Sequence, residues 1–138
     1  MEIRRLGPTD AEAVLGAGHL FDAEPDAVWV EDFLSRDGHH LLVAYEDGEP
    51  VGFISGMELA HPDKGVEMLL YELGVDEPFR RRGIGRTLIG ALADLGRERG
   101  CRSMWVPIEG GDDVAAAVYR SAGAGPVDPA GILEWSLD

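Results

Sequence analysis

The chain has few of the residues that form cross-links or hold metal ions. Its 138 residues include one cysteine, Cys101, and four histidines. A single cysteine cannot form an internal disulfide, which fits a reducing compartment. The histidines do not have the spacing that puts metal ligands on one helix face. We therefore expect neither a disulfide nor a metal site.

Long apolar runs are also missing. No run approaches the ~20 residues that a membrane span needs, and the N-terminal MEIRRLGPTD lacks the apolar core of a signal peptide. We expect a cytoplasmic protein that does not enter a membrane. With 45% hydrophobic residues, the chain can bury the core of one domain, residues 1–138.

Basic residues are scarce. Lysine and arginine number 12 against 26 aspartates and glutamates, so the formal net charge is −14. This charge argues against nucleic acid as a partner. It suits a cationic small molecule, although acidity can also serve only to keep a protein soluble. Both interpretations of the charge remain open.

One short segment departs from this composition. Positions 80–86 read RRRGIGR and hold four of the 12 basic residues, whereas the other 131 positions hold eight. Glycine lets a ligand approach the backbone, and the first N–H groups of a helix lack internal partners. The alternative is an ordinary solvated helix start. The segment predicts a pyrophosphate site made by Arg80, Arg81, Arg82, Gly83, Ile84, Gly85, Arg86 and Thr87.

The glycine spacing excludes two common phosphate motifs. GxGxxxxG differs from the GxGxxG of dinucleotide-binding folds, and the Gly-Lys-Ser/Thr of a P-loop is absent. The loop resembles the Arg/Gln-x-x-Gly-x-Gly/Ala motif of the GCN5-related N-acetyltransferases, which Arg80, Gly83 and Gly85 match. This resemblance implies acetyl-CoA as cofactor. It also implies that the preceding strand splays from its neighbour, so that the backbone of Leu73, Gly74 and Val75 pairs with the pantetheine arm.

A second motif lies near the C-terminus. DDVAAAVYRSAG resembles the family pattern Asn-x-x-Ala-x-x-x-Tyr-x-x-x-Gly-Phe, with Asp112 in place of asparagine and Ala124 in place of phenylalanine. Gly-Asp-Asp before this helix, and a Tyr-acidic-Leu-x-Val strand before the loop, are similar to type I aminoglycoside 3-N-acetyltransferases. That resemblance implies acetylation of the 3-amino group of a deoxystreptamine antibiotic, and suggests a homodimer. The residues concerned are Tyr71, Glu72, Leu73, Val75, Gly111, Asp112, Asp113 and Tyr119.

Periodicity predicts an α/β fold, and the resemblance predicts the acetyltransferase form of it. We expect a mixed central sheet flanked by helices, with an antiparallel meander in its N-terminal half. Thr9 and Glu12 fit a capping box, Val28 should face the core, and Trp105 and Trp135 should be buried. The expected strands are 2–6, 39–45, 50–60, 66–75, 102–108 and 132–137, and the expected helices are 10–19, from 27, from the glycine loop to Gly100, and 114–122.

Acetyl transfer to an amine needs a base and an acid. Glu72 is the candidate base, or only an anchor for the ammonium. The alternative is that Glu72 is simply a strand carboxylate that faces solvent. Tyr119 is the candidate acid for the departing thiolate, and its alternative is a core tyrosine. The backbone N–H of Leu73 is the candidate oxyanion donor.

Several further carboxylates could bind a polycationic acceptor. Asp22, Glu24 and Asp26 could form one wall of a cleft, with Asp112 and Asp113 forming another. One of the last two can cap a helix while the other stays free. The leading hypothesis is an aminoglycoside N-acetyltransferase that works by direct transfer in a ternary complex. The alternatives are an enzyme for a polyamine or another small amine, and a non-catalytic acyl-CoA-binding module.

Overall fold

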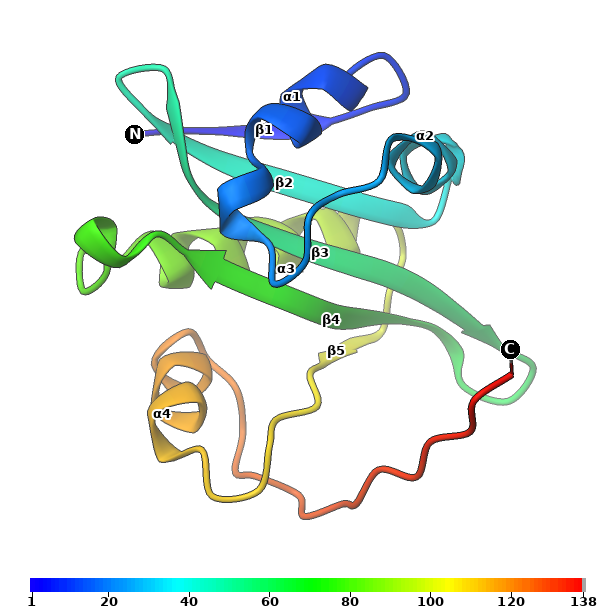
Figure 1. Ribbon diagram of the computed structural model, residues 1–138. Coiled ribbons are helices and arrows are strands. Elements are labelled where there is room, and N and C mark those ends of the chain that lie inside the picture. The colour runs from blue at the N-terminus through cyan, green and yellow to red at the C-terminus, as the bar shows by residue number, and fades with distance from the viewer. Residues whose placement is uncertain (138) are drawn as a thin grey trace.

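The protein forms one five-stranded sheet with helices on both faces (Figure 1). A computed structural model describes residues 1–137. Strand order is β1-β2-β3-β4-β5; all neighbours are antiparallel except β4 and β5, which are parallel. This confirms the predicted α/β class and the meander. The elements are β1 (Glu2–Leu6), α1 (Ala11–Gly16), η1 (Gly18–Leu20), α2 (Ala27–Ser35), β2 (His39–Glu46), β3 (Glu49–His61), β4 (Gly65–Val75), η2 (Glu77–Phe79), α3 (Ile84–Glu98), β5 (Ser103–Trp105) and α4 (Asp113–Ser121).

Each face of the sheet has its own core. On one face, Leu88 and Leu92 of α3 pack with Met68 and Leu70 of β4. On the other face, α1 and α2 pack against β2, β3 and Phe53. The apolar stripe of α3 is fully buried, as helical periodicity predicted. Among residues 1–137, no helix combines the length and the hydropathy that crossing a membrane requires.

The N-terminal helices differ from the prediction. Thr9 and Glu12 do not form a capping box, because Asp10 occupies the N-cap and its carboxylate accepts from the Gly7 N–H at 2.7 Å. Val28 does not face the core, since 72% of its surface is exposed. Asp26 caps α2, and the helix buries Val30 and the predicted Leu34 against the sheet, with the predicted Phe33 packed beside them.

The C-terminal part also differs. β5 spans only three residues, because β4 and β5 pair from Glu67 with Ser103 to Leu69 with Trp105 and then separate. Residues 132–137 do not form the predicted strand. Trp105 and Trp135, predicted to be buried, are 45% and 75% exposed. A strand without a neighbour has nothing to cover its side chains.

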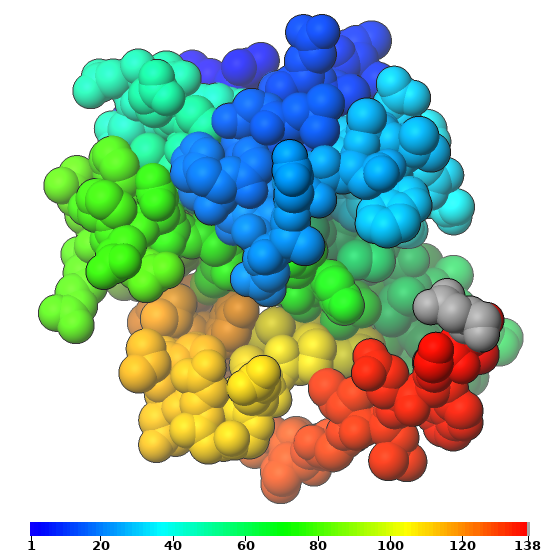
Figure 2. Space-filling view, in the orientation of Figure 1, coloured from blue at the N-terminus to red at the C-terminus, as the bar shows by residue number. Residues whose placement is uncertain are grey.

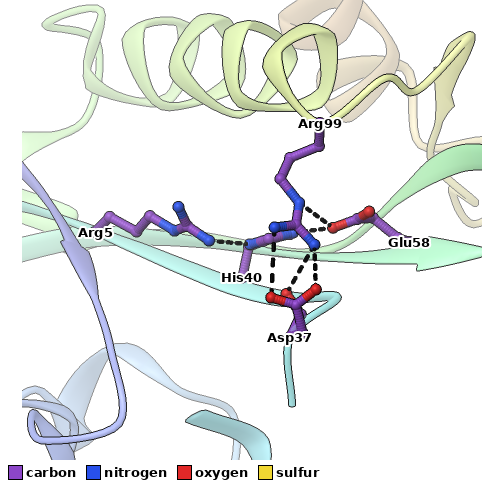
Figure 3. Close-up of polar contacts among 5 residues, drawn as sticks. All are labelled: Arg5, Asp37, His40, Glu58 and Arg99. Carbon is purple, nitrogen blue, oxygen red and sulfur yellow. Dashed lines mark hydrogen bonds and ion pairs between the residues drawn. The ribbon is translucent and has the colours of Figure 1, made fainter. Parts of the chain in front are cut away.

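A polar network around the buried His40 fixes the C-terminal end of α3 to the sheet (Figure 3). His40 is 1% exposed; its Nε2 lies 2.6 Å from Glu58 and its Nδ1 lies 3.1 Å from Arg5. Arg99 donates to Glu58 at 2.8 Å and to Asp37 at 2.8 Å. Arginine only donates hydrogen bonds, and a carboxylate only accepts them. His40 Nδ1 therefore accepts from Arg5 and its Nε2–H donates to Glu58, so the ring is neutral. The network joins β1, β2, β3 and α3.

Candidate active site

Strand β4 carries a bulge directly before Glu72. Ser55 pairs with Glu72 and Gly56 pairs with Leu70, which leaves Tyr71 as an extra residue. A bulge reverses the alternation of side chains along a strand. Met68 and Leu70 therefore face α3, while Glu72 turns to the face covered by α1 and α2. Without the bulge, Glu72 would point into the core under α3.

Asp22 lies close enough to Glu72 to affect the ionisation of the Glu72 carboxyl. Burial, and then the negative charge of Asp22, raise the pKa of the Glu72 carboxyl above its ordinary value. Such a group is ionised with more difficulty than an exposed glutamate, and accepts a proton more readily. The structure therefore brings a candidate base and one predicted acceptor carboxylate together.

The loop that carries Asp22 encloses a hollow of about 480 Å³. Asp22 and Glu24 line this hollow together with His19 and Phe21. His19 Nε2 donates to the Pro50 carbonyl at 3.2 Å, which ties the loop to the start of β3. In Figure 2 the loop, in blue, lies over the middle of the molecule next to the strands. Its carboxylates form a negatively charged surface on the side to which Glu72 turns.

The predicted anion site lies at the start of α3. Gly83 is the N-cap with φ of 80°, and Arg81 also has a positive φ of 64°. Left-handed residues in such a loop direct successive N–H groups to one side. Within residues 1–137, the N–H groups of Ile84 and Gly85 donate to no backbone carbonyl. A methyl group built on Gly83 would enter open space, so a ligand can reach this backbone.

The four arginines of this loop differ in what they contact. Arg80 donates from Nε to the Val75 carbonyl at 2.9 Å, which links the loop to the end of β4. Arg82 lies over the Phe79 ring at 5.2 Å. Within residues 1–137, none of Arg80, Arg81, Arg82 and Arg86 forms an ion pair. This positive charge, beside free helix amides, suits a diphosphate group.

Between the loop and Glu72, one edge of β4 has no neighbouring strand. Pairing with β5 ends at Leu69, whereas β4 continues to Val75. The backbone of Leu73, Gly74 and Val75 is therefore unpaired on the β5 side, in agreement with the predicted splay. The side chains of Leu73 and Val75 pack against the core under α3. A ligand along this edge would therefore contact their backbone groups.

Tyr119 approaches from the other face of the sheet. It packs, half-buried, against the core under α3. Burial, and then the negative charge of Asp112, raise the pKa of its hydroxyl, so the hydroxyl keeps its proton at neutral pH. α4, which carries it, is capped by Asp112, whose Oδ1 accepts from the Ala115 N–H at 3.0 Å. Glu72 and Tyr119 thus lie on opposite faces of the sheet.

The remaining predicted carboxylates are divided between different roles. Asp26 Oδ1 accepts from Val28 and Trp29 N–H at 2.9 and 3.1 Å, so it caps α2. Asp112 caps α4, whereas the side chain of Asp113 makes no hydrogen bond or ion pair within residues 1–137. Asp26 does not line the hollow that holds Asp22 and Glu24.

One residue of the site, Ser55, was not among the predicted ones, and Gly74 has a packing role in addition to its predicted one. The Glu72 N–H donates to Ser55 Oγ at 3.1 Å, which compensates for the ladder bond that the bulge removes. Ser55 is 4% exposed, and a lone hydroxyl inside VGFISGM was the sequence signal for it. Gly74 allows close packing, since a methyl group there would lie 2.7 Å from Phe53 and 2.9 Å from the Leu20 carbonyl. Its predicted backbone role and this packing role are compatible.

The sequence was compared with families and curated proteins. The model of the acetyltransferase (GNAT) family matches residues 10–124. L-2,4-diaminobutyric acid acetyltransferase of Streptomyces coelicolor is 33% identical over 100 residues, which are 68% of this chain and 53% of the relative. Mycothiol acetyltransferase of Beutenbergia cavernae is 30% identical over 136 residues, 91% of this chain and 45% of the relative. The chain thus spans about half the length of these two relatives.

Solved structures resemble the fold along almost the whole chain. An aminoglycoside acetyltransferase from an uncultured soil metagenomic sample, in complex with sisomicin, has a TM-score of 0.90 at 23% identity, covering 99% of this chain and 96% of its own. Aminoglycoside N-acetyltransferase AAC(6′)-Iy, in complex with CoA, has a TM-score of 0.82 at 23% identity, covering 97% and 93%. At this identity the likeness shows the shared fold.

Proposed function

Since the chain belongs to the acetyltransferase (GNAT) family, we propose that it transfers an acetyl group from acetyl-CoA to an amino group of an aminoglycoside. The observation that carries this proposal is the bulge at Tyr71. It turns Glu72 to the face covered by α1 and α2, where the charge of Asp22 acts on it, next to the strand edge where the cofactor arm is expected. On that face, Asp22 and Glu24 line a hollow in the loop between α1 and α2. A base beside a loop with several carboxylates suits an acceptor with several ammonium groups.

Residues at the start of α3 hold the cofactor in this proposal. The N–H groups of Ile84 and Gly85, with the surrounding guanidiniums, bind its diphosphate. The unpaired backbone C=O and N–H groups of Leu73 and Val75 accept and donate hydrogen bonds along its pantetheine arm. Bound acetyl-CoA supplies the acetyl group as a thioester. The N–H of Leu73 donates to the carbonyl oxygen as negative charge develops there.

Glu72 and Tyr119 move the protons. An alkylamine with a pKa of ~10 is almost fully protonated at pH 7, about three pH units below its pKa, so forming the neutral amine costs roughly 4 kcal/mol. Glu72 anchors the ammonium and accepts its proton, directly or through a water, as the amine nitrogen bonds to the carbonyl carbon. Tyr119 then donates its proton to the thiolate as the carbon–sulfur bond breaks. Both substrates are bound during this single transfer.

The 3-amino group of a deoxystreptamine antibiotic is the proposed acceptor position. Its support is the Gly-Asp-Asp sequence before α4 and the Tyr-Glu-Leu-x-Val sequence of β4. In the proposed site Asp113 supplies a second carboxylate, because Asp112 is used as the cap of α4. Asp26 supports the site by capping the start of α2 and does not contact the acceptor directly.

A second candidate acceptor is a small diamine or polyamine. The relative from Streptomyces coelicolor, whose name specifies L-2,4-diaminobutyric acid, favours it. The acidic hollow favours acceptors without a carboxylate, such as polyamines and aminoglycosides, over an amino acid. Incubating the protein with acetyl-CoA and each acceptor, and measuring released CoA, separates the candidates. Turnover of polyamines without turnover of gentamicin-type antibiotics would refute the aminoglycoside, and no transfer at all would favour a binding module.

The same assay tests the two proton-transfer residues. We expect Glu72→Gln and Tyr119→Phe each to lower kcat roughly 10²-fold or more, because each removes one proton-transfer group. Glu67→Gln is the matched control: Glu67 lies on the same strand but pairs with His61 at 3.0 Å, and its substitution should leave kcat unchanged. Unchanged kcat in both site variants contradicts the assigned roles. Mass spectrometry counts the added acetyl groups, and NMR locates the modified nitrogen.

A further inference from the structure

The loop of residues 18–25 carries two carboxylates of the hollow at its exposed tip, residues 22–24. Asp22 and Glu24 line the hollow, and both are exposed. Within residues 1–137, neither side chain forms a hydrogen bond or an ion pair, and the N–H groups of the tip donate to no backbone carbonyl. The position of the tip therefore depends on how the residues beside it are held.

Two packing contacts hold the loop close to the sheet. The Leu20 carbonyl lies over β4, where a methyl group built on Gly74 would approach it to 2.9 Å. The Phe21 ring packs against Phe53 of β3, with 4.2 Å between the ring centroids. In Figure 1 the loop, in blue, crosses in front of β3. Apolar packing is not directional, so these contacts fix how near the loop lies but not how its tip is oriented.

His19 supplies a directional contact. Among residues 1–137, its bond from Nε2 to the Pro50 carbonyl, at 3.2 Å, is the one side-chain hydrogen bond between this loop and the sheet. Asp76 Oδ2 lies 3.8 Å from the same nitrogen, and the Asp76 N–H donates to the Val51 carbonyl at 2.8 Å. Asp76 directly precedes η2, which leads to the arginine loop. His19 therefore lies where the carboxylate loop, the start of β3 and the segment before the predicted cofactor loop meet.

We propose that His19 is a positioning residue of the transfer reaction, whose hydrogen bond to Pro50 fixes the direction in which the tip presents Asp22 and Glu24 to the acceptor. This inference rests on the proposed function, in which those carboxylates bind the ammonium groups of the acceptor. His19 transfers no proton in the reaction. A hydrogen bond has a preferred angle as well as a preferred length, so it restricts the rotation that the packing contacts allow.

The position of Asp22 can be followed through Glu72. Burial, and then the charge of Asp22, raise the pKa of the Glu72 carboxyl, and no other charged group within residues 1–137 contributes to this shift. His19 therefore does not act on Glu72 directly. If the tip moves away, the repulsion from Asp22 falls with distance, and any loss of burial acts in the same direction. Loss of the His19 hydrogen bond should therefore lower the pKa of Glu72, although His19 carries no negative charge.

Steady-state measurements of CoA release test the positioning role. In His19→Ala the acceptor KM should rise roughly threefold to tenfold, since one hydrogen bond is lost. The acidic limb of kcat/KM should move to lower pH, while CoA affinity in isothermal titration stays unchanged. His19→Gln should restore both values, because its amide N–H can donate to Pro50 from nearly the same place. His61→Ala is the matched control: His61 lies at the other end of β3, paired with Glu67, and its substitution should change none of these values.

Hydrogen exchange tests the anchoring without any acceptor. Amides 20–24 should exchange faster in His19→Ala than in the native protein, and His19→Gln should restore the native rate. Equal exchange in His19→Ala and the native protein overturns the anchoring by His19. An acceptor KM and an acidic limb that stay at their native values in His19→Ala overturn the positioning role, as does a His19→Gln variant that behaves like His19→Ala. Absence of transfer by the native protein refutes the proposed function instead, so the two failures are distinguishable.

Discussion

Glu72 and Asp22 are two carboxylates that share one side of the site, and their coupling has a measurable consequence. Burial, followed by the charge of Asp22, raises the pKa of Glu72. A base with a raised pKa becomes active only when the pH exceeds that value, so it sets the acidic limb of the rate profile. In the proposed mechanism, Asp22 should therefore influence the pH dependence of the reaction as well as the binding of the acceptor.

This coupling gives a prediction for the pH profile. Asp22→Asn removes the negative charge, so the pKa of Glu72 falls, and the acidic limb of kcat/KM should move to lower pH. The acceptor KM should rise, because one carboxylate of the hollow is lost. Glu24→Gln is the control, because Glu24 lines the same hollow. In this variant the acceptor KM should rise, but the acidic limb of kcat/KM should not move. An unmoved limb in Asp22→Asn, measured by CoA release from pH 5 to 9, contradicts Glu72 as the titrating base.

At the scale of elements, α3 joins two functions in one helix. Its N-terminal end presents unpaired amides at the arginine loop, and its buried stripe holds it against β2, β3 and β4. Both ends of the helix have a glycine with positive φ, Gly83 at 80° and Gly100 at 82°. A methyl group at either position meets no atom within 4 Å. Both positions therefore place the same limits on a side chain, whereas only Gly83 lies in the proposed cofactor site.

The pair provides an internally controlled test of the cofactor site. Gly83→Ala and Gly100→Ala should each lower the free energy of unfolding by about 1 kcal/mol, because alanine is strained at positive φ. Only Gly83→Ala should weaken CoA binding, by tenfold or more, since the loss of one charge-assisted contact costs roughly 1.5–3 kcal/mol. Isothermal titration with CoA measures this difference. Equal affinities in the two variants would show that the cofactor binds away from this loop.

At the scale of the whole molecule, the His40 network joins three strands of the sheet to the C-terminal end of α3. His40 and Glu58 connect β2 with β3, and Arg99 connects them with the end of α3 (Figure 3). Burial is the main cause that lowers the pKa of His40 below 6.5. Burial alone would raise the pKa of Glu58, but hydrogen bonds from His40 and Arg99 outweigh it and lower the pKa. Both shifts oppose protonation of the folded state.

Stability should therefore decrease in acid. Below pH ~6.5 the unfolded chain binds a proton at His40 that the folded chain resists, so the free energy of unfolding falls as pH decreases through this range. Glu58 adds a further loss once the pH falls below its ordinary 4.5. His40→Gln should be less stable at pH 7.5 but lose less stability between pH 7.5 and 5.5. Urea unfolding at both pH values measures this, with His61→Gln, at a more exposed ion pair, as control. An equal loss in His40→Gln and the native protein would exclude His40 as the cause.

Local patterns in the sequence determined the order of elements, the arginine and glycine loop and the family, because these depend on neighbours along the chain. Tertiary structure alone decided where Glu72 points, since one extra residue in β4 relative to β3 reverses the side-chain alternation. It also decided that Asp22 lies beside Glu72 while Asp26 caps a helix. The predicted strand 132–137 was wrong for a related reason: alternation shows which residues can form a strand, whereas pairing depends on a partner that periodicity does not specify.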